Sequence, residues 1–144
     1  MRIYLGADHR GFELKNEIVG WLKATQKDYV DLGAFELLPE DDYNDYTKSV
    51  VQEILKNPEE ARGVLLCGSA QGMCMQANRF KGIRAAHCHN ATEMAESRSH
   101  NDANIVCIPA DELVDYAAII DALLETEFLT LEKYIRRNRK LDEE

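Results

Sequence analysis

A cysteine followed by a glycine-rich loop is the most reactive feature of the sequence. Three apolar residues, Val64 to Leu66, predict the end of a buried strand, and Cys67 stands where that strand stops. Gly68 and Gly72 bracket a tight loop before residues 73–79, which are helix-tolerant and contain no proline. A strand, a glycine loop and a helix in this order direct free backbone N–H groups at the loop. The segment therefore predicts a binding site for an anion.

The thiol at the edge of this loop has two interpretations. Free N–H groups and the helix dipole would lower the pKa of Cys67 and make it a better base or nucleophile. Alternatively, Cys67 is a small buried core residue, as free cysteines often are. Its place at the carboxyl end of a strand, beside glycines, favours the functional interpretation. We therefore expect a thiol with a lowered pKa.

The spacing of the motif excludes several familiar sites. Two glycines four residues apart match neither the three-glycine dinucleotide fingerprint nor the Gly-Lys-Ser/Thr of a P-loop. The loop ends in Gly72 and Met73, without the closing arginine that a cysteine phosphatase needs. His87 and His89 share one face of a predicted strand, but no cysteine pair completes a tetrahedral zinc set with them. We therefore expect neither a metal nor a cofactor.

The remaining groups suit the transfer of a proton next to a carbonyl. Such an enolisation needs a base for the proton and donors that hold the enediolate oxygen. Cys67 and its loop offer both, and the segment from residue 99 to 104 adds the imidazole of His100 beside amide side chains. His100 could equally be a helix cap or a satisfied surface histidine.

The composition is ordinary for a globular protein. The chain has 144 residues, enough for one domain, with 45% hydrophobic and 30% charged residues. A formal net charge of −9 argues against nucleic acid or an anionic membrane as a partner. No apolar run approaches the roughly 20 residues that span a bilayer, and we expect no signal peptide. Four cysteines without a C-x-x-C pair indicate reduced thiols and a cytoplasmic protein.

Strand and helix patterns alternate along the chain. Strands are predicted at residues 2–7, 29–32, 83–89 and 104–108 and up to residue 67, with helices at 12–22, 43–55, 73–79, 91–99 and 112–124. The last helix is expected to bury a face made of Leu113, Tyr116, Ala117, Ile120, Leu123 and Leu124. Helical crossovers force parallel strands, so we expect an α/β fold, a Rossmann-like three-layer α/β/α sandwich of about five parallel strands. One domain spans residues 1–144 in this interpretation, with a charged helical tail from about residue 129.

Two loops with reactive groups are predicted at the same edge of this sheet. Asp8, His9 and Arg10 follow the first strand, and Cys67 with its loop follows the third. Parallel sheets bind ligands outside the carboxyl ends of their strands, near a point where the strand order reverses. We therefore expect the two loops to form one site.

Five segments resemble the ribose-5-phosphate isomerase B family, which includes the galactose-6-phosphate isomerase subunits. They are Gly6 to Lys15, Asp42 to Tyr46, Cys67 to Met73, Ala77 to Ala85 and His100 to Asn104, and their order and spacing match from residue 3 to about 128. The resemblance implies a metal-free interconversion of ribose 5-phosphate and ribulose 5-phosphate. It also implies a homodimer or homotetramer whose active sites are shared between subunits.

The resemblance assigns roles to individual residues. Cys67 corresponds to the base that moves a proton between carbons 1 and 2, and His100 to the histidine that helps open the furanose ring. Ser69 keeps a hydroxyl that can bond the thiolate, and Asp8 joins these three in the expected catalytic set. The expected substrate-binding set is His9, Arg10, Tyr43, Gly68, Ala70, Gln71, Gly72, Met73, Asn101, Arg136 and Arg137. Tyr43 has helix packing as its alternative role.

The sequence departs from the family where the phosphate is expected. Members usually carry Gly-Ala-Arg or Gly-Ser-Arg after the fifth strand, where this chain has Pro109 to Asp111. The arginine-histidine pair near the family's C-terminus has no clean equivalent, although Arg136 or Arg137 can match its last arginine. Arg10 either compensates for Asp111 or is a salt-bridged surface arginine. Two alternatives stay open: an isomerase of another sugar phosphate, such as a hexose 6-phosphate, or a non-catalytic sugar-phosphate-binding subunit.

Overall fold

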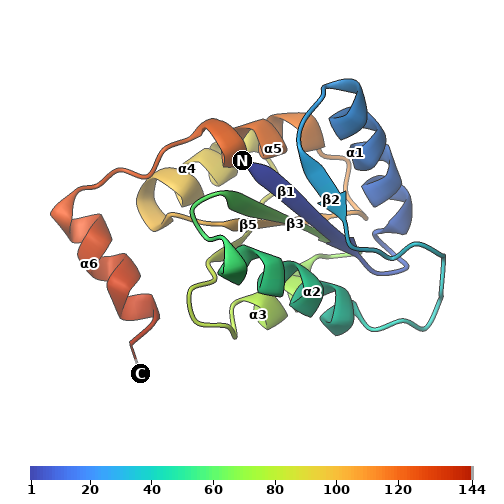
Figure 1. Cartoon of the computed structure of the whole chain (residues 1–144), viewed down its shortest axis with the longest axis horizontal. Helices are drawn as coiled ribbons and strands as arrows, with labels where there is room; N and C mark the ends of the chain where they lie inside the picture. Colours follow the sequence, from blue (N-terminus) through green and yellow to red (C-terminus); the bar gives the residue numbers. More distant parts are fainter. Residues whose placement is uncertain (144) are drawn as a thin grey trace.

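Five parallel strands form one sheet, in the order β2-β1-β3-β5-β4 (Figure 1). The computed structural model describes residues 1–143. Its strands are β1 (Arg2–Ala7), β2 (Tyr29–Asp31), β3 (Ala61–Cys67), β4 (Ala85–His87) and β5 (Ile105–Pro109). Every residue of β3 is buried, because this strand is central and helices cover both of its faces.

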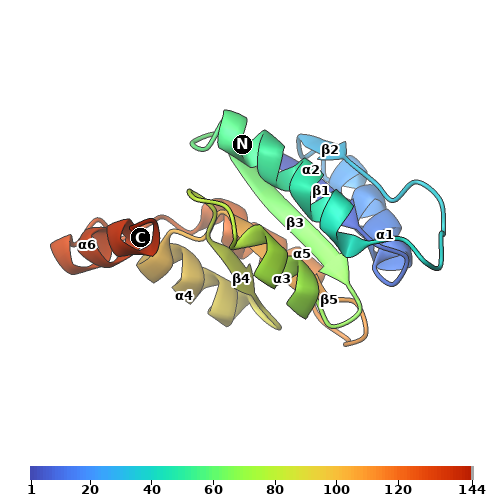
Figure 2. The ribbon, with the colours of Figure 1, turned by 90° about the horizontal axis from the view of Figure 1, so that it is seen from below.

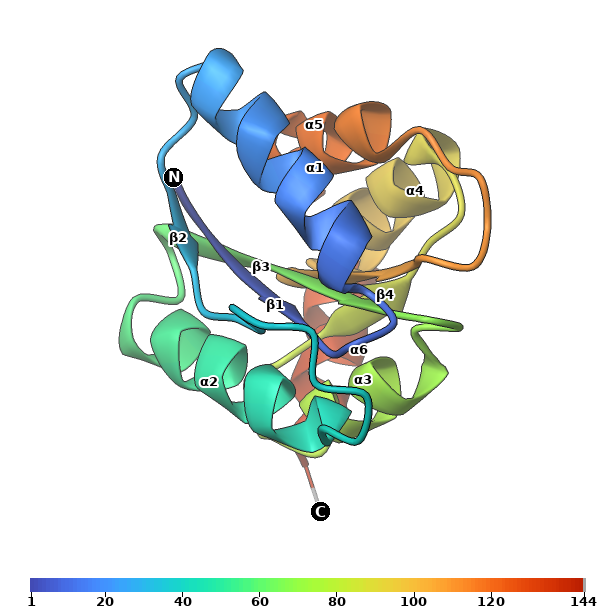
Figure 3. The ribbon, with the colours of Figure 1, turned by 90° about the vertical axis from the view of Figure 1, so that its right-hand side faces the viewer.

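The helices form a layer on each face of the sheet. On one face lie α1 (Phe12–Ala24), α4 (Ala91–Asn101) and α5 (Tyr116–Glu125), and on the other lie α2 (Tyr43–Lys56) and α3 (Gln71–Ala77) (Figure 2, Figure 3). This arrangement confirms the predicted three-layer α/β fold. A last helix, α6 (Glu132–Leu141), extends away from the layers and has no buried residue (Figure 1). No helix in residues 1–143 has the length and apolar character needed to cross a membrane.

Alternate residues of β3 face opposite helix layers, as they must in an extended strand. Val64 and Leu66 pack in the core cluster shared with α1, α4 and α5. Leu65 and Cys67 pack in the cluster shared with α2 and α3. The sulfur of Cys67 therefore lies on the side of the sheet that α2 and α3 cover.

The boundaries of one helix and one strand differ from the predictions in ways that affect the site. α3 begins at Gln71, two residues before the predicted start, and the preceding Ala70 has a left-handed backbone with φ of 62°. β4 is limited to Ala85–His87 and is shorter than predicted. The loop after Cys67 is therefore only three residues long before α3 begins.

The start of α5 overturns one core prediction. Asp115 caps the helix, since its side-chain oxygen accepts the N–H of Ala118 at 3.0 Å, and α5 begins at Tyr116. Leu113 therefore precedes the helix. Its side chain is fully exposed, so its predicted place in the core is wrong.

The strand order reverses between β1 and β3. From β1 the chain crosses to β2 at one edge of the sheet, and from β3 it crosses to β4 at the other. The two strands pair side by side, with Ala7 opposite Leu66. The connections that leave them diverge at their carboxyl ends, which is where parallel sheets bind ligands.

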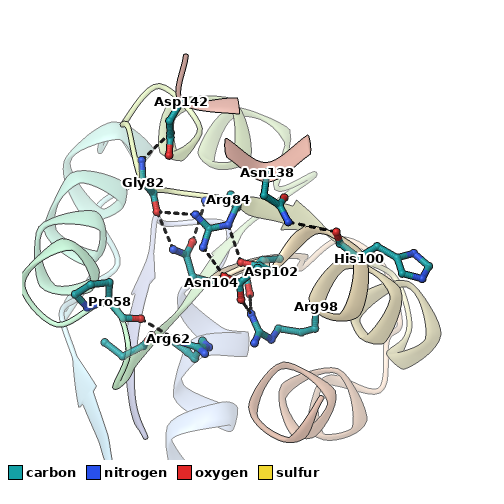
Figure 4. A network of polar contacts seen from close by, with 12 residues as sticks. Pro58, Arg62, Gly82, Arg84, Arg98, His100, Asp102, Asn104, Asn138 and Asp142 are labelled. Carbon is teal, nitrogen blue, oxygen red and sulfur yellow. Dashed lines mark hydrogen bonds and ion pairs between the residues drawn. The ribbon is translucent and has the colours of Figure 1, made fainter. Parts of the chain in front are cut away.

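A polar network lies at the amino ends of the strands, at the opposite end of the sheet from the loop after Cys67 (Figure 4). Asp102, the residue after α4, accepts hydrogen bonds from Arg84 at 3.1 Å and from the buried Arg98 at 2.7 Å. Asp142, the residue after α6, accepts the N–H of Gly82 at 2.9 Å. These bonds hold the ends of α4 and α6 beside the amino ends of β4 and β5.

Candidate active site

The loop after β1 is shaped by the carboxylate of Asp8. Its Oδ1 accepts the N–H groups of Arg10 at 2.9 Å and Gly11 at 3.1 Å. Burial raises the pKa of Asp8, and these two hydrogen bonds oppose the increase. A Cβ at Gly11 would overlap the carbonyl of Leu66, so only glycine lets the start of α1 approach β3 this closely. The loop thus holds a buried carboxyl group beside the end of β3.

His9 is oriented by a carboxylate from a distant loop. Asp41, which lies between β2 and α2, accepts both the ring Nδ1–H of His9 at 2.7 Å and its backbone N–H at 3.0 Å. Burial would raise the pKa of Asp41, but the side-chain and backbone hydrogen bonds from His9 lower it below its usual value. Within residues 1–143 the other ring nitrogen, Nε2, makes no hydrogen bond, so it can meet a ligand.

One group of side chains could hold a cation. Ligand atoms of Asp8, His9 and Asp41 lie within 4.8 Å of one another. The closest of these atoms already bond each other or the backbone, since His9 bonds Asp41 and Asp8 accepts two N–H groups. These bonds use one oxygen of each carboxylate, and the buried Oδ2 of Asp41 has no hydrogen-bond partner within residues 1–143.

Cys67 lies between the loop after β1 and the glycine loop that follows it. Its side chain is buried, and burial together with the neighbouring charge of Asp8 raises the pKa of the thiol. Hydrogen bonds from the backbone N–H groups of Met73 and Ala70 and the charge of Arg10 act in the opposite direction. The expected lowering of this pKa is thus wrong in sign. The N–H groups act as predicted, but the desolvation of a sulfur packed into the core outweighs them.

The loop after Cys67 is held from two sides. The ring Nε2–H of His87, at the end of β4, donates to the carbonyl of Ser69 at 2.8 Å. The exposed Ser69 hydroxyl accepts the N–H of Gln71 at 3.4 Å, which places it over the first turn of α3. Both bonds fix the orientation of the peptide groups between Gly68 and Ala70, and therefore the direction of their N–H donors.

Tyr43 covers the start of α3. A Cβ at Gly72 would lie 2.6 Å from the Cζ of Tyr43, so the aromatic ring rests directly on this glycine. Tyr43 is the first residue of α2 and is half-buried. Its ring therefore packs against the first turn of α3, next to the loop that follows Cys67.

An ion pair spans the loops after β1 and β5. Arg10 pairs with Asp111, and its guanidinium lies so close to Gly68 that a Cβ there would overlap it. The backbone N–H of Asp111 donates to the carbonyl of Gly68 at 3.0 Å, and that of Ala110 donates to Cys67 at 3.0 Å. The carboxyl ends of β1, β3 and β5 are thus joined around Cys67.

Four of the predicted site residues lie at the other end of the sheet, beside the amino ends of the strands. They are His100, Asn101, Arg136 and Arg137, on α4 and α6. His100 stacks on Tyr134 of α6 with ring centroids 4.9 Å apart, and Figure 4 shows its ring pointing out of the network. Arg136 pairs with Glu132 of its own helix at 2.7 Å. Within one chain, these residues do not meet Cys67.

Comparison with known proteins settles the family. The sequence pattern of the Ribose/Galactose Isomerase family matches residues 3–142. This chain belongs to that family. A curated relative, the probable ribose-5-phosphate isomerase B of Mycoplasma pneumoniae, is 38% identical over 128 residues, which are 88% of this chain and 84% of the relative.

Solved isomerase structures share the whole fold. The crystal structure of a ribose 5-phosphate isomerase from Thermotoga maritima has a TM-score of 0.93 and 39% identity, and the match covers 99% of this chain and 98% of that one. Ribose-5-phosphate isomerase B from Mycoplasma genitalium, solved with bound ribulose-5-phosphate, has a TM-score of 0.90 and 34% identity, with 97% and 93% covered. The resemblance found in the sequence is confirmed.

Three contacts of this site were not predicted as pairs, although a salt bridge was one of the two roles expected for Arg10. Asp41 orients His9, His87 supports the loop at Ser69, and Asp111 pairs with Arg10. The contact of His87 could have been found from the sequence. His87 ends β4, and the carboxyl ends of parallel strands lie at the same end of the sheet as the loop after Cys67. The other two pairs join loops 32 and 101 residues apart, and no local pattern connects them.

Proposed function

We propose that this protein is a ribose-5-phosphate isomerase that interconverts ribose 5-phosphate and ribulose 5-phosphate through an enediolate. The observation that carries the proposal is the position of Cys67, buried at the end of β3 and bonded by the N–H groups of Met73 and Ala70. A thiol surrounded by preorganised donors supplies both the base and the oxyanion stabilisation that enolisation needs. The relatives named for this reaction support the same choice.

In the proposed mechanism, the thiolate of Cys67 takes the proton from carbon 2 and returns it to carbon 1. A thiolate with a raised pKa is a strong base for a weakly acidic C–H, although little of it is present at neutral pH. The N–H groups from Gly68 to Met73 hold the negative oxygen that develops on the substrate. Ser69, with its hydroxyl at the mouth of the loop, completes the donor set. No metal or cofactor is required for these steps.

In this proposal the residues of the β1 loop, together with Tyr43 of α2, bind the rest of the sugar phosphate. Asp8 and Tyr43 accept or donate hydrogen bonds to its hydroxyl groups, and His9 offers its free ring edge to the phosphate end. Arg10 is the cation that lies directly on the loop, against Gly68. The charges of Asp8 and Arg10 both act on the Cys67 thiol, and Tyr43 packs on Gly72 of the next helix, which supports these assignments.

The active site is completed by a second copy of the chain. His100, Asn101, Arg136 and Arg137 lie at the far edge, where their own Cys67 does not reach them. α6 is exposed along its length, including the apolar Leu131, Ile135 and Leu141 beside and within it. A helix without any buried residue is expected to pack on a partner. We therefore propose a homodimer or homotetramer, in the reducing cytoplasm that suits four free cysteines.

A proton NMR time course in deuterated water tests the reaction. Ribose 5-phosphate should be converted to ribulose 5-phosphate by the unsubstituted protein and not by Cys67→Ala, with deuterium at carbon 2 of the recovered substrate. Conversion by Cys67→Ala at an undiminished rate would assign the base to another residue. The same assay with hexose 6-phosphates tests the alternative that Asp111 keeps open, and binding without turnover of any sugar phosphate would indicate a non-catalytic subunit.

A further inference from the structure

The guanidinium of Arg10 occupies a special position over the loop that follows Cys67. The turn from Asp8 to Gly11 fixes the backbone of Arg10 through two hydrogen bonds to the Asp8 carboxylate. The side chain then lies flat against Gly68, where no larger residue would leave room for it. Its positive charge acts on the Cys67 thiol and favours the thiolate. A cation in this place can meet an anionic ligand at the loop after Cys67.

The guanidinium of Arg10 already forms an ion pair with Asp111. The carboxylate of Asp111 accepts from Nη2 of Arg10, and the backbone N–H of Asp111 is bonded to Gly68 at 3.0 Å. Asp111 is therefore held beside the loop by its main chain as well as by its charge. The side chains of both partners are about half exposed, at 53% and 49%, so the pair can exchange partners without unpacking the core.

The surroundings of the pair are acidic. A hollow of about 320 Å³ beside Arg10 is lined by Glu13, Glu17 and Glu112, and Arg10 is the one cation among its lining residues. In this field an arginine neutralised by an aspartate presents no net positive charge to a ligand. A phosphate dianion would approach Arg10 only against the charge of Asp111.

We propose that Asp111 is a specificity-determining residue that competes internally with the phosphate group of the substrate for Arg10. The proposal rests on the function proposed above and refines it. In the free protein the carboxylate holds the guanidinium over Gly68, and the phosphate ester takes its place when the sugar binds. The pair thus weakens the binding of phosphorylated ligands and leaves the binding of the neutral part of the sugar unchanged.

The size of the effect follows from simple electrostatics. Solvent screens an exposed ion pair such as that of Arg10 and Asp111, and it also weakens the repulsion between Asp111 and a nearby phosphate. Removing the charge of Asp111 abolishes both the competing pair and its repulsion of the phosphate. Together these effects predict a gain of about tenfold in affinity for a phosphorylated ligand.

Calorimetric titration of the full chain tests the proposal. The probes are ribitol 5-phosphate, which has no carbonyl and cannot be isomerised, and ribitol as its neutral counterpart. Asp111→Asn should bind ribitol 5-phosphate about tenfold more tightly than the unsubstituted protein and bind ribitol within about twofold of it. Glu112→Gln is the matched control, because it removes the same charge from a neighbouring carboxylate that pairs with His89 at 3.4 Å instead.

A double-mutant cycle separates competition from a general change of charge. Arg10→Gln should weaken the binding of ribitol 5-phosphate. In a chain that carries Arg10→Gln, the further change Asp111→Asn should alter the affinity by less than about twofold. The proposal is overturned if Asp111→Asn does not raise the affinity for ribitol 5-phosphate, or if Glu112→Gln raises it equally. It is also overturned if Asp111→Asn has the same effect in a chain that carries Arg10→Gln. Absence of any ribitol 5-phosphate binding to Asp111→Asn overturns it as well.

The isomerisation assay distinguishes this result from the proposed function. Tighter binding in Asp111→Asn, with no turnover of ribose 5-phosphate by any variant, would support the competition and reject the isomerase. Turnover by the unsubstituted protein, with no change in phosphate affinity in Asp111→Asn, would do the reverse.

Discussion

The imidazole of His87 donates a hydrogen bond to the carbonyl of Ser69 at 2.8 Å, which ties the last residue of β4 to the loop after Cys67. The neighbouring His89 stacks edge-on against His87, with ring centroids 4.7 Å apart, and bonds Glu93 instead of the loop. The side chain of His87 therefore controls where the N–H groups of this loop point.

Loss of this support should slow the reaction more than it weakens binding. His87→Ala should lower kcat about tenfold with a smaller change in KM, because misdirected donors stabilise the enediolate less than the bound sugar. His87→Gln, which can still donate to the Ser69 carbonyl, should recover most of the rate. Steady-state kinetics measures both constants, and His89→Gln is the control for the loss of a nearby imidazole. A loss in His89→Gln as large as that in His87→Ala would contradict the prediction.

The rate should rise with pH through the neutral and alkaline range. The pKa of Cys67 is raised by burial and by Asp8, and the thiolate is the active base, so the active form increases until the pH passes this pKa. Because this pKa lies above that of an ordinary thiol, only a minor part of Cys67 is thiolate at neutral pH. The pH dependence of kcat/KM reports this group in the free enzyme.

Removal of the positive charge of Arg10 should shift that profile. Because Arg10 favours the Cys67 thiolate, Arg10→Gln should move the apparent pKa of kcat/KM to higher pH. An unshifted or lower apparent pKa in Arg10→Gln would show that the titrating group is not this thiol. Lys23→Gln, on the exposed last turn of α1, is a control that removes one positive charge away from the site.

The close approach of α1 to β3 predicts opposite effects at two glycines of the same segment. Gly11→Ala should lower the free energy of unfolding by about 2–3 kcal/mol, because the new Cβ overlaps the backbone of Leu66 and forces the elements apart. Gly20→Ala is the matched change in the exposed middle of α1, where a Cβ meets nothing within 4 Å. It should raise the stability by about 0.5–1 kcal/mol. Urea unfolding of the two variants measures both values, and a stable Gly11→Ala would refute the steric argument.

Two inactive variants should restore activity when they are mixed as subunits. If Cys67 of one copy works with His100 of the next, a dimer of one Cys67→Ala and one His100→Asn chain has one intact site and one doubly altered site. Random reassortment after mild unfolding and refolding should therefore recover about a quarter of the activity of the unsubstituted protein. Each variant refolded alone is the control. A mixture no more active than the two controls would place the complete site within one chain.

The sequence allowed the meeting of Cys67 and Asp8 at one end of the sheet to be predicted because its signals are local. The apolar run before Cys67, the glycines after it and the alternation of strands with helices fix a strand end beside a loop, and parallel topology brings Asp8 to the same edge. The start of α5 was missed although Asp115 is a favourable capping residue, because the apolar spacing was continued back to Leu113.

The charges of the site depend on contacts that no local pattern encodes. Whether His9 meets Asp41, or Arg10 meets Asp111, is decided by loops that approach each other only in the folded chain. The direction of the pKa shift of Cys67 likewise depends on how deeply its sulfur is buried. A free thiol at a glycine loop was therefore predictable, and its acidity was not.

Because side chains alternate along β3, the position of Cys67 in the strand decides on which face of the sheet its sulfur lies. Leu65 and Cys67 share one face because they are two residues apart, and the helices α2 and α3 cover that face. Insertion or deletion of a single residue within β3 would transfer the sulfur to the layer of α1, α4 and α5, while a change of two residues would return it. Length changes in this strand are consequently compatible with a thiol at the pocket only in even steps.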